Sequence, residues 1–219
     1  MPSWPLPSVI HLQTLASVEA GAEGWAFKLS TPDAAADTDR SSIWWLDRQH
    51  RLTRLTVEHE SAFGPRWSPC GRKIAFLRSI NGKTQVLSLS LDGGEARQLS
   101  NVEDGVVSIE DWVDDRLLIL AHRGSAPGTA PYVVDHLPYK TDGIGPRVGQ
   151  ATYLCQLEAE TGHMAAIVAD SGDVVEACCS PDGETIAYVQ KRDGSQRHTM
   201  DIWLKRRGDR ARRLDTPLV

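Results

Sequence analysis

Several features that would identify a metal protein, an exported protein or a membrane protein are missing from this sequence. None of the four cysteines, Cys70, Cys155, Cys178 and Cys179, belongs to a Cys-x-x-Cys pair or to a cysteine–histidine cluster with zinc-site spacing. The first residues lack the basic start and continuous apolar core of a secretion signal, and no apolar run is long enough to span a membrane. We therefore expect reduced thiols, a cytoplasmic location, and neither a metal nor a cofactor.

The sequence also has fewer basic than acidic residues, 24 Lys and Arg against 29 Asp and Glu. The net charge of −5 and the isoelectric point near 5.8 argue against a nucleic-acid-binding protein, because phosphate contacts require a basic surface. One basic run stands near the end of the sequence: Lys205, Arg206, Arg207, Arg210, Arg212 and Arg213. We interpret this run as the solvated edge of a sheet, where Lys and Arg discourage pairing with other strands. Neither a nucleic acid nor a membrane is expected as a partner.

The signature of a serine hydrolase active site is absent. No Gly-x-Ser-x-Gly nucleophile elbow occurs, and a similar string at residues 124–128 has the wrong spacing. The seven histidines are scattered, and none accompanies both a nucleophile and an orienting acid. The sequence therefore predicts no catalytic, cofactor-binding or metal-binding residue, and we expect the chain alone to be inactive.

Helical periodicity is scarce. Residues 6–20 could form a short helix, but Pro5 and Pro7 weaken that interpretation, and no other stretch combines the helical pattern with caps. The composition is nevertheless that of a soluble globular protein, with 41% hydrophobic and 24% charged residues. A chain of 219 residues is long enough to bury a core. These observations favour an all-β fold.

An internal repeat runs along the chain. Residues 65–76 and 177–188 share the pattern Ser-Pro-x-Gly-x-x-Ile-Ala-aromatic, and residues 110–120 keep the tryptophan, an acidic turn and the apolar strand. Each copy reads as a β-hairpin, because Pro and Gly supply the turn conformations and an apolar run forms the following strand. A second hairpin follows each copy, with apolar alternation and a polar turn. Two hairpins give four strands per unit.

Four-stranded units at this spacing are typical of β-propeller blades, so the sequence predicts a partial β-propeller of about four antiparallel blades. The predicted blades cover residues 25–56, 62–100, 105–169 and 172–216, within a propeller segment 25–219. Residues 1–24 are expected to form an N-terminal extension. A Gly- and Pro-rich insertion at about 123–150 explains the greater length of the third unit.

The repeat resembles a known family. Residues 65–79 and 178–194 are similar to the Trp-Ser-Pro-Asp-Gly blades of the prolyl oligopeptidase family, particularly its acylaminoacyl-peptidase-like branch, and of TolB-like propellers. Residues 136–145 resemble the peptidase branch in particular. The chain departs from the pattern at Cys70, where the family has Asp, and at Cys179, where it has Trp. Each of these changes alters one position of one repeat, so the fold prediction is unaffected.

The resemblance implies a propeller that covers an α/β-hydrolase domain and limits the access of large folded substrates. Because such propellers usually have about seven or eight blades and this chain has four apparent ones, we expect a truncated segment. Its function would be the substrate-gating and hydrolase-docking portion of a serine peptidase for oligopeptides or acylated peptides, with the hydrolase domain C-terminal to it. The alternatives are a freestanding TolB-like module that binds protein or peptide, and a decayed protein without activity. With open end blades, the isolated chain is expected to be oligomeric or aggregation-prone.

Other candidate sites have simpler explanations. We expect the tryptophans at repeat positions to pack between blades; these are Trp44, Trp45, Trp67, Trp112 and Trp203. Acidic and glycine residues at 92–94 and 114–115 read as turns, because no calcium-binding loop surrounds them. Asp142 and Gly143, in the insertion, are either a turn in a long loop or a contact that docks the hydrolase or lines the substrate path.

Overall fold

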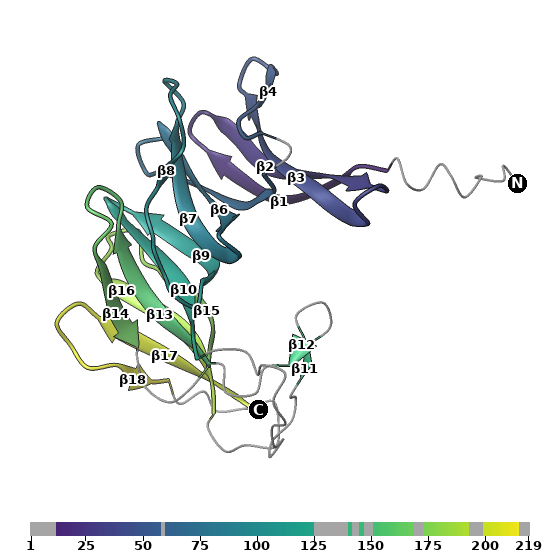
Figure 1. The fold of residues 1–219 in the computed structure, drawn as a ribbon. Helices are drawn as coiled ribbons and strands as arrows, with labels where there is room; N and C mark the ends of the chain where they lie inside the picture. Colours follow the sequence, from purple (N-terminus) through teal and green to yellow (C-terminus); the bar gives the residue numbers. More distant parts are fainter. Residues whose placement is uncertain are drawn as a thin grey trace, which may run out of the picture. The chain divides into compact units, whose positions relative to one another are not determined.

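The computed structural model describes residues 12–57, 60–124, 140–141, 145–146, 151–168, 173–192 and 199–214, and these form β-strands and turns throughout (Figure 1). The strands make four four-stranded antiparallel sheets, as the sequence predicts. Among these residues there is no helix of the length and apolar character that crossing a membrane requires. The chain divides into two units, Met1–Ser100 and Asn101–Val219, with two of the four-stranded sheets in each.

The first unit contains two sheets whose strands follow one another in chain order. The strands of the first sheet are β1 (Thr14–Gly21), β2 (Gly24–Asp33), β3 (Thr38–Asp47) and β4 (Leu52–Arg54). The strands of the second sheet are β5 (Ala62–Trp67), β6 (Lys73–Ile80), β7 (Lys83–Ser90) and β8 (Arg97–Gln98). Each sheet is a pair of hairpins, so every strand pairs with its neighbour in sequence.

The second unit keeps the same order, apart from an insertion in its first sheet. The strands of that sheet are β9 (Val106–Val113), β10 (Arg116–Arg123), β13 (Ala151–Glu158) and β14 (Met164–Val168). The strands of the next sheet are β15 (Val174–Cys179), β16 (Thr185–Lys191), β17 (Met200–Arg206) and β18 (Arg212–Arg213). Between β10 and β13, the short strands β11 (Lys140–Thr141) and β12 (Gly145–Pro146) pair with each other.

The N-terminal part of the chain differs from the sequence-based expectation. The first sheet starts at Thr14 rather than near residue 25, because β1 pairs with β2 from Thr14 opposite Ser30 to Gly21 opposite Gly24. Residues 14–20 therefore lie in a strand and not in the short helix that the sequence weakly suggested for residues 6–20. A bulge between Ala16 and Glu19 breaks the alternation of β1, and Ser17 within it has a φ of 51°. An interrupted alternation removes the signal by which a strand is recognised.

The Ser-Pro-x-Gly repeats form the turn that joins the first two strands of a sheet. Ser68 donates its backbone N–H to Lys73 O at 2.9 Å, and its hydroxyl oxygen accepts the Lys73 N–H at 2.9 Å. Ser180 makes the same pair of bonds with Thr185, at 2.8 and 2.9 Å. Gly71 and Gly183 have φ values of 69° and 70°, a conformation that costs other residues energy. The repeated sequence thus encodes a repeated turn.

Each unit has its own core between its two sheets. In the first unit the buried cluster joins side chains from β2, β3, β5, β6 and β7: Ala26, Ile43, Ala62, Trp67, Ile74, Phe76 and Leu87. In the second unit it joins β10, β13, β14, β15 and β16: Leu118, Leu120, Leu154, Val168, Val174, Ala177 and Tyr188. Tyr188 also stacks on Trp203, with ring centroids 6.3 Å apart. Face-to-face packing of neighbouring sheets is the packing expected of propeller blades.

Candidate functional site

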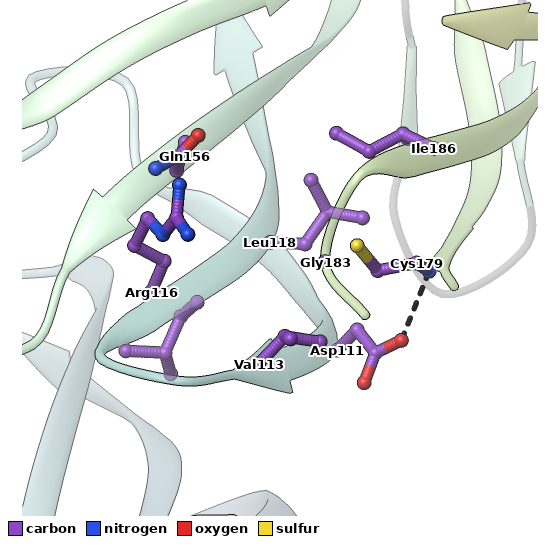
Figure 2. Close-up of a pocket in the computed structure, with 9 residues that line it drawn as sticks. Asp111, Val113, Arg116, Leu118, Gln156, Cys179, Gly183 and Ile186 are labelled. Carbon is purple, nitrogen blue, oxygen red and sulfur yellow. Dashed lines mark hydrogen bonds between the residues drawn. The ribbon is translucent and has the colours of Figure 1, made fainter. Parts of the chain in front are cut away.

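The second unit contains a pocket between its two four-stranded sheets (Figure 2). The cavity has a volume of about 30 Å³, the space of one or two water molecules, and it opens to solvent. The lining comes from β9, β10, β13, β15, β16 and the turn before β16: Asp111, Val113, Arg116, Leu117, Leu118, Gln156, Cys179, Gly183 and Ile186. Figure 2 shows Arg116 and Gln156 together on one side and Cys179 beside Asp111 on the other. The pocket is therefore mainly apolar, with polar groups at its edges.

Two carboxylates next to the pocket are already bound to backbone amides. Asp111 Oδ2 accepts the N–H of Cys179 at 3.0 Å, and Asp111 Oδ1 accepts the N–H of Trp112 at 2.9 Å. Glu110 Oε2 accepts the N–H of Ala177 at 3.0 Å. The bonds from Cys179 and Ala177 connect β9 to β15, the first strand of the next sheet. A carboxylate that accepts amide N–H bonds in this way has a structural role and is a poor general base.

Cys179 is poorly suited to nucleophilic chemistry. Burial raises the pKa of its thiol, and the negative charge of Asp111 raises it further, while Arg116 acts in the opposite direction. The thiolate is the reactive form of cysteine, so a raised pKa keeps Cys179 neutral and unreactive at neutral pH. Arg116 lies 3.5 Å from an Asp114 oxygen and 3.6 Å from an Asp115 oxygen, both on exposed side chains. The acidic turn at 114–115 is therefore accounted for by an arginine contact.

The first unit shows what fills the corresponding space when the repeat is intact. Trp67 precedes Ser-Pro there as Cys179 does in the second unit, and each residue pairs with an isoleucine, Ile74 or Ile186. The Trp67 indole lies against Gly21, where an added Cβ would come within 2.6 Å of the ring. Its Nε1 donates to Glu19 O at 3.2 Å. An indole thus occupies the space between these two sheets.

The residue that corresponds to Gly21 in the second unit is Val113. Gly21 ends β1 opposite Gly24, and Val113 ends β9 opposite Arg116, each at a two-residue turn. The first unit therefore has a large side chain, Trp67, facing Gly21. In the second unit a smaller side chain, Cys179, takes the place of the tryptophan, and Val113 takes the place of the glycine. The change at Cys179 is visible in the sequence, but the pocket is not, because only the packing of the two sheets shows which residues surround it.

The tryptophans expected to pack between blades have the following positions. Trp67 and Trp112 are buried, and Trp45 packs at the edge of the first unit's core. Trp203 packs at the edge of the second unit's core. Trp44 is half-buried and donates its Nε1 to Ser42 Oγ at 3.0 Å.

The remaining candidate residues do not form a catalytic or metal-binding group in the part of the chain that the structure describes. Asp142 and Gly143 lie outside the described residues, as do His11, His59, His136 and His198. The three described histidines lie in different places: His50 in the turn after β3, His122 in β10 and His163 before β14. Within the described ranges, no three His, Cys, Asp or Glu residues are grouped so as to hold a metal ion.

The basic run lies at the outer edge of the last sheet. Lys205 and Arg206 end β17, Arg212 and Arg213 form β18, and the turn between these strands contains the others. Several of these groups have acceptors nearby: Lys205 Nζ donates to Asp209 O at 3.2 Å, and Arg207 lies 3.8 Å from Glu184. An exposed edge strand of basic residues agrees with the interpretation made from the sequence.

No protein-family model matches the chain. It is 30% identical over 196 residues to the uncharacterized peptidase YuxL of Bacillus subtilis, a match that covers 81% of this chain and 30% of YuxL. It is 29% identical over 164 residues to the lasso peptide isopeptidase AtxE2 of Asticcacaulis excentricus, covering 66% of this chain and 23% of AtxE2. The chain thus spans about a third or less of these relatives.

The solved structures that it resembles include complete peptidases and isolated propellers. The acylaminoacyl peptidase of Pyrococcus horikoshii matches 97% of this chain with a TM-score of 0.74 and 20% identity, over 34% of its own length. The β-propeller domain of the Trilobed protease of Pyrococcus furiosus matches 93% of this chain with a TM-score of 0.59 and 14% identity. A putative TolB of Agrobacterium tumefaciens matches 86% with a TM-score of 0.58 and 13% identity. At these identities the structures establish the fold alone.

The four antiparallel sheets, their hairpin order and these neighbours define a set of β-propeller blades. The resemblance predicted from the repeat is confirmed: the sequence relatives of the chain are peptidases, its structural neighbours include the acylaminoacyl peptidase, and the prolyl oligopeptidase family is consistent with both.

Proposed function

We propose that this chain is the propeller portion of a serine peptidase that cleaves oligopeptides or acylated peptides. Its role in that enzyme is to gate substrate access and to dock an α/β-hydrolase domain that supplies the catalytic residues. The main observation in support of this proposal is the match to the peptidase YuxL, which covers 81% of this chain but only 30% of YuxL. The matched part corresponds to blades, and a peptidase needs a further domain for its chemistry.

The described residues support a structural rather than a catalytic role. The pocket between the sheets of the second unit has its two neighbouring carboxylates bound to amides and its thiol neutral at neutral pH. Its geometry offers neither an activated nucleophile nor a base beside one. In this proposal the peptide bond is cleaved by groups that another domain provides.

The native polypeptide provides the test. An antibody raised against residues 62–216 would be used to blot and to immunoprecipitate the protein from its source cells, and the precipitate would be treated with a fluorophosphonate that labels active serines. We expect a band about three times heavier than 24.1 kDa, because the chain spans 30% of the peptidase relative, and we expect that band to be labelled. The purified 219-residue chain is the matched control and should stay unlabelled.

The second candidate is a freestanding TolB-like propeller that binds a protein or a peptide. The observation in its favour is the fold match to the putative TolB, which covers 86% of this chain and 60% of that chain. A native band at 24.1 kDa that takes no fluorophosphonate label would contradict the peptidase proposal and favour this one.

The cytoplasmic location expected from the sequence belongs to the same proposal. All four cysteines are free, and Cys178 and Cys179, although adjacent, do not form a disulfide. Free thiols are typical of proteins in reducing compartments. Fractionation of the source cells with the same antibody would test the location, and recovery of the protein outside the cytoplasm would contradict it.

A further inference from the structure

We propose that two copies of this chain associate head to tail, so that the last sheet of one copy packs on the first sheet of the other. The surfaces involved are the outer faces of these sheets, which are the faces turned away from the core of each unit. Both carry exposed apolar side chains, with Leu15, Trp25 and Leu52 on the first sheet and Met200 and Ile202 on the last. The association is independent of the peptidase activity proposed above, because it requires no catalytic residue.

Consecutive sheets pack by the same rule in both units. The second strands β2, β6 and β16 share the pattern apolar–Ala–aromatic, at residues 25–27, 74–76 and 186–188. In the first unit Ile74 and Phe76, which flank the alanine of β6, share a core with Ala26, the alanine of β2. Ile186 and Tyr188 of the last sheet likewise face the core shared with the sheet before it. Each sheet thus turns its flanking residues toward the preceding sheet and its middle residue toward the following one, since neighbours in a strand point to opposite faces.

The outer face of the first sheet has the residues of a face that packs on a preceding sheet. Its flanking residues, Trp25 and Phe27, point away from the unit's core, and their partners on β3 are Leu46 and Trp44. The same positions of the second sheet hold apolar residues that pack on the first sheet. The outer face of the first sheet is therefore one half of an interface between sheets.

The outer face of the last sheet supplies the other half. Its middle residue is Ala187, which lies opposite Leu204, and Ile202 is on the same face of the neighbouring strand β17. Ala187 and Ile202 have the sheet positions that Ala26 and Ile43 have in the first sheet. Ala26 and Ile43 are completely buried in the core shared with the second sheet. The last sheet thus presents the apolar face on which a following sheet packs.

A second copy of the chain is the partner that satisfies both faces at once. Each copy carries both halves of the packing that recurs within its units, so one kind of contact buries the first sheet of one copy and the last sheet of the other. Such a contact is heterologous, because it joins two different surfaces. Burial of the exposed apolar side chains provides its driving force.

The repeat also predicts where the first strands of the two sheets should meet. In the second unit the Asp111 carboxylate of β9 accepts the Cys179 N–H of β15 at 3.0 Å, so these strands are in direct contact there. The corresponding positions, by their pairing within each sheet, are Cys178 in β15 and Ala20 in β1, and both are exposed. The Cys178 of one copy should therefore lie beside the Ala20 of the other. The substitution Ala20→Cys would bring two thiols within reach of a short cross-linker.

Cross-linking with a short bismaleimide tests this arrangement in the 219-residue chain, in a Cys70→Ser background that removes the exposed thiol of Cys70. Each thiol adds across the double bond of one maleimide, so the product is a covalent pair of chains. Ala20→Cys should be linked to Cys178 roughly a hundredfold faster than Thr53→Cys, because thiols in an associated pair meet at an effective concentration near millimolar rather than micromolar. Thr53 is the matched control, since it is exposed in the first sheet but points to the face opposite that of Leu52. Mass spectrometry of the linked peptides identifies the two cysteines.

A mixing experiment separates head-to-tail association from a contact between two identical faces. Trp25→Glu disrupts the outer face of the first sheet, and Ile202→Glu disrupts that of the last. Each variant alone should sediment closer to the monomer than the unmodified chain at micromolar concentration. A mixture of the two should associate again, because the intact last sheet of the Trp25→Glu chain can pack on the intact first sheet of the Ile202→Glu chain.

Three results would overturn the proposal, with circular dichroism showing that each variant is folded. The first is equal cross-linking of Ala20→Cys and Thr53→Cys, and the second is association that Ile202→Glu leaves unchanged. The third is a monomeric unmodified chain, which would assign the two outer faces to further blades of a longer polypeptide.

Discussion

At the scale of single residues, the most informative side chain is Cys70, which stands where the other Ser-Pro-x-Gly turn has Asp182. In that turn the Asp182 carboxylate accepts the Ser180 hydroxyl and the Glu184 N–H, so the turn is built to hold a negative charge. Hydrogen bonding from Ser180 first, and from Glu184 next, lowers the pKa of Asp182. Cys70 places a thiol in the same surroundings.

The prediction that follows concerns thiol reactivity. The Ser68 hydroxyl, 3.4 Å from the Cys70 sulfur, lowers the pKa of that thiol, and the Arg72 N–H lowers it further. Burial raises the pKa of Cys155 to about 11. A lowered pKa gives more thiolate at a given pH, so iodoacetamide should modify Cys70 first, with a rate that rises with pH at lower values than for a free cysteine.

Cys155 is the matched control and should react only when the chain is unfolded. Its raised pKa means that the folded state favours the neutral thiol, so the associated stability is present at neutral pH and is lost only as pH rises from about 9 toward 11. Mass spectrometry of the modified peptides from pH 6 to 10 would measure both rates. Equal reactivity of Cys70 and a small thiol at every pH would contradict the prediction.

At the scale of elements, the first strand of one sheet is joined to the first strand of the next by polar and apolar contacts together. In the first unit Arg66 pairs with Glu19 at 2.9 Å, beside the contact between Trp67 and Gly21. In the second unit Glu110 and Asp111 accept amide N–H groups of β15. The two units therefore join the first strands of consecutive sheets through different residues.

A double-mutant cycle on Gly21 and Trp67 tests this interpretation. Gly21→Val should destabilise the chain by about 1–3 kcal/mol, because the added side chain overlaps the indole. Trp67→Cys should cost about 3–5 kcal/mol, because it removes a large buried side chain. Together the changes create the Val–Cys pair of the second unit and should cost less than their sum, since the valine then fills part of the space.

Urea unfolding followed by tryptophan fluorescence and circular dichroism would measure the free energies of unfolding. The control is Gly82→Val at a loop glycine whose Cβ would have no neighbour within 4 Å, which reports only the cost of backbone strain at a φ of 77°. Strict additivity of the Gly21 and Trp67 changes would show that the two residues do not share one space.

At the scale of the whole molecule, the sheets present exposed apolar side chains on the faces turned away from their cores. In the first sheet Trp25, Leu52 and Leu15 are 44%, 55% and 55% exposed, and they point away from Ala26 and its cluster. In the last sheet Ile202 is 41% exposed, on the face opposite Trp203. Blades normally bury such faces against further blades.

We predict that the isolated 219-residue chain associates in solution. Introducing negative charge on the exposed face of the first sheet should reduce this association. Trp25→Glu with Leu52→Glu should shift the sedimentation profile at micromolar concentration toward the monomer, because exposed apolar surface drives association. Thr14→Glu adds charge at an exposed polar position of the same sheet and is the matched control. A monomeric profile of the unmodified chain would contradict the prediction.

How much of this molecule can be predicted from sequence depends on how local each feature is. The blades follow from local chemistry: Ser-Pro-x-Gly turns, alternating apolar strands and short loops specify hairpins whose strands are adjacent in sequence. These signals were enough for the all-β class, the four sheets and the peptidase resemblance. Strand β1 cannot be predicted in this way, because its bulge at residues 16–19 interrupts the alternation and because its place in the sheet depends on pairing with β2.

Only the tertiary structure shows which residues surround Cys179, at the position where the other repeat has a tryptophan. The sequence by itself determined that Cys179 departs from the repeat, since an internal copy with Trp67 exists for comparison. It could not show that Val113, Arg116 and Gln156 surround that position, because they come from strands β9, β10 and β13, whose positions around Cys179 depend on the packing of one sheet on another. Hairpins form from neighbours in the chain, whereas a pocket between sheets exists only after non-local apolar surfaces have packed and left a space unfilled.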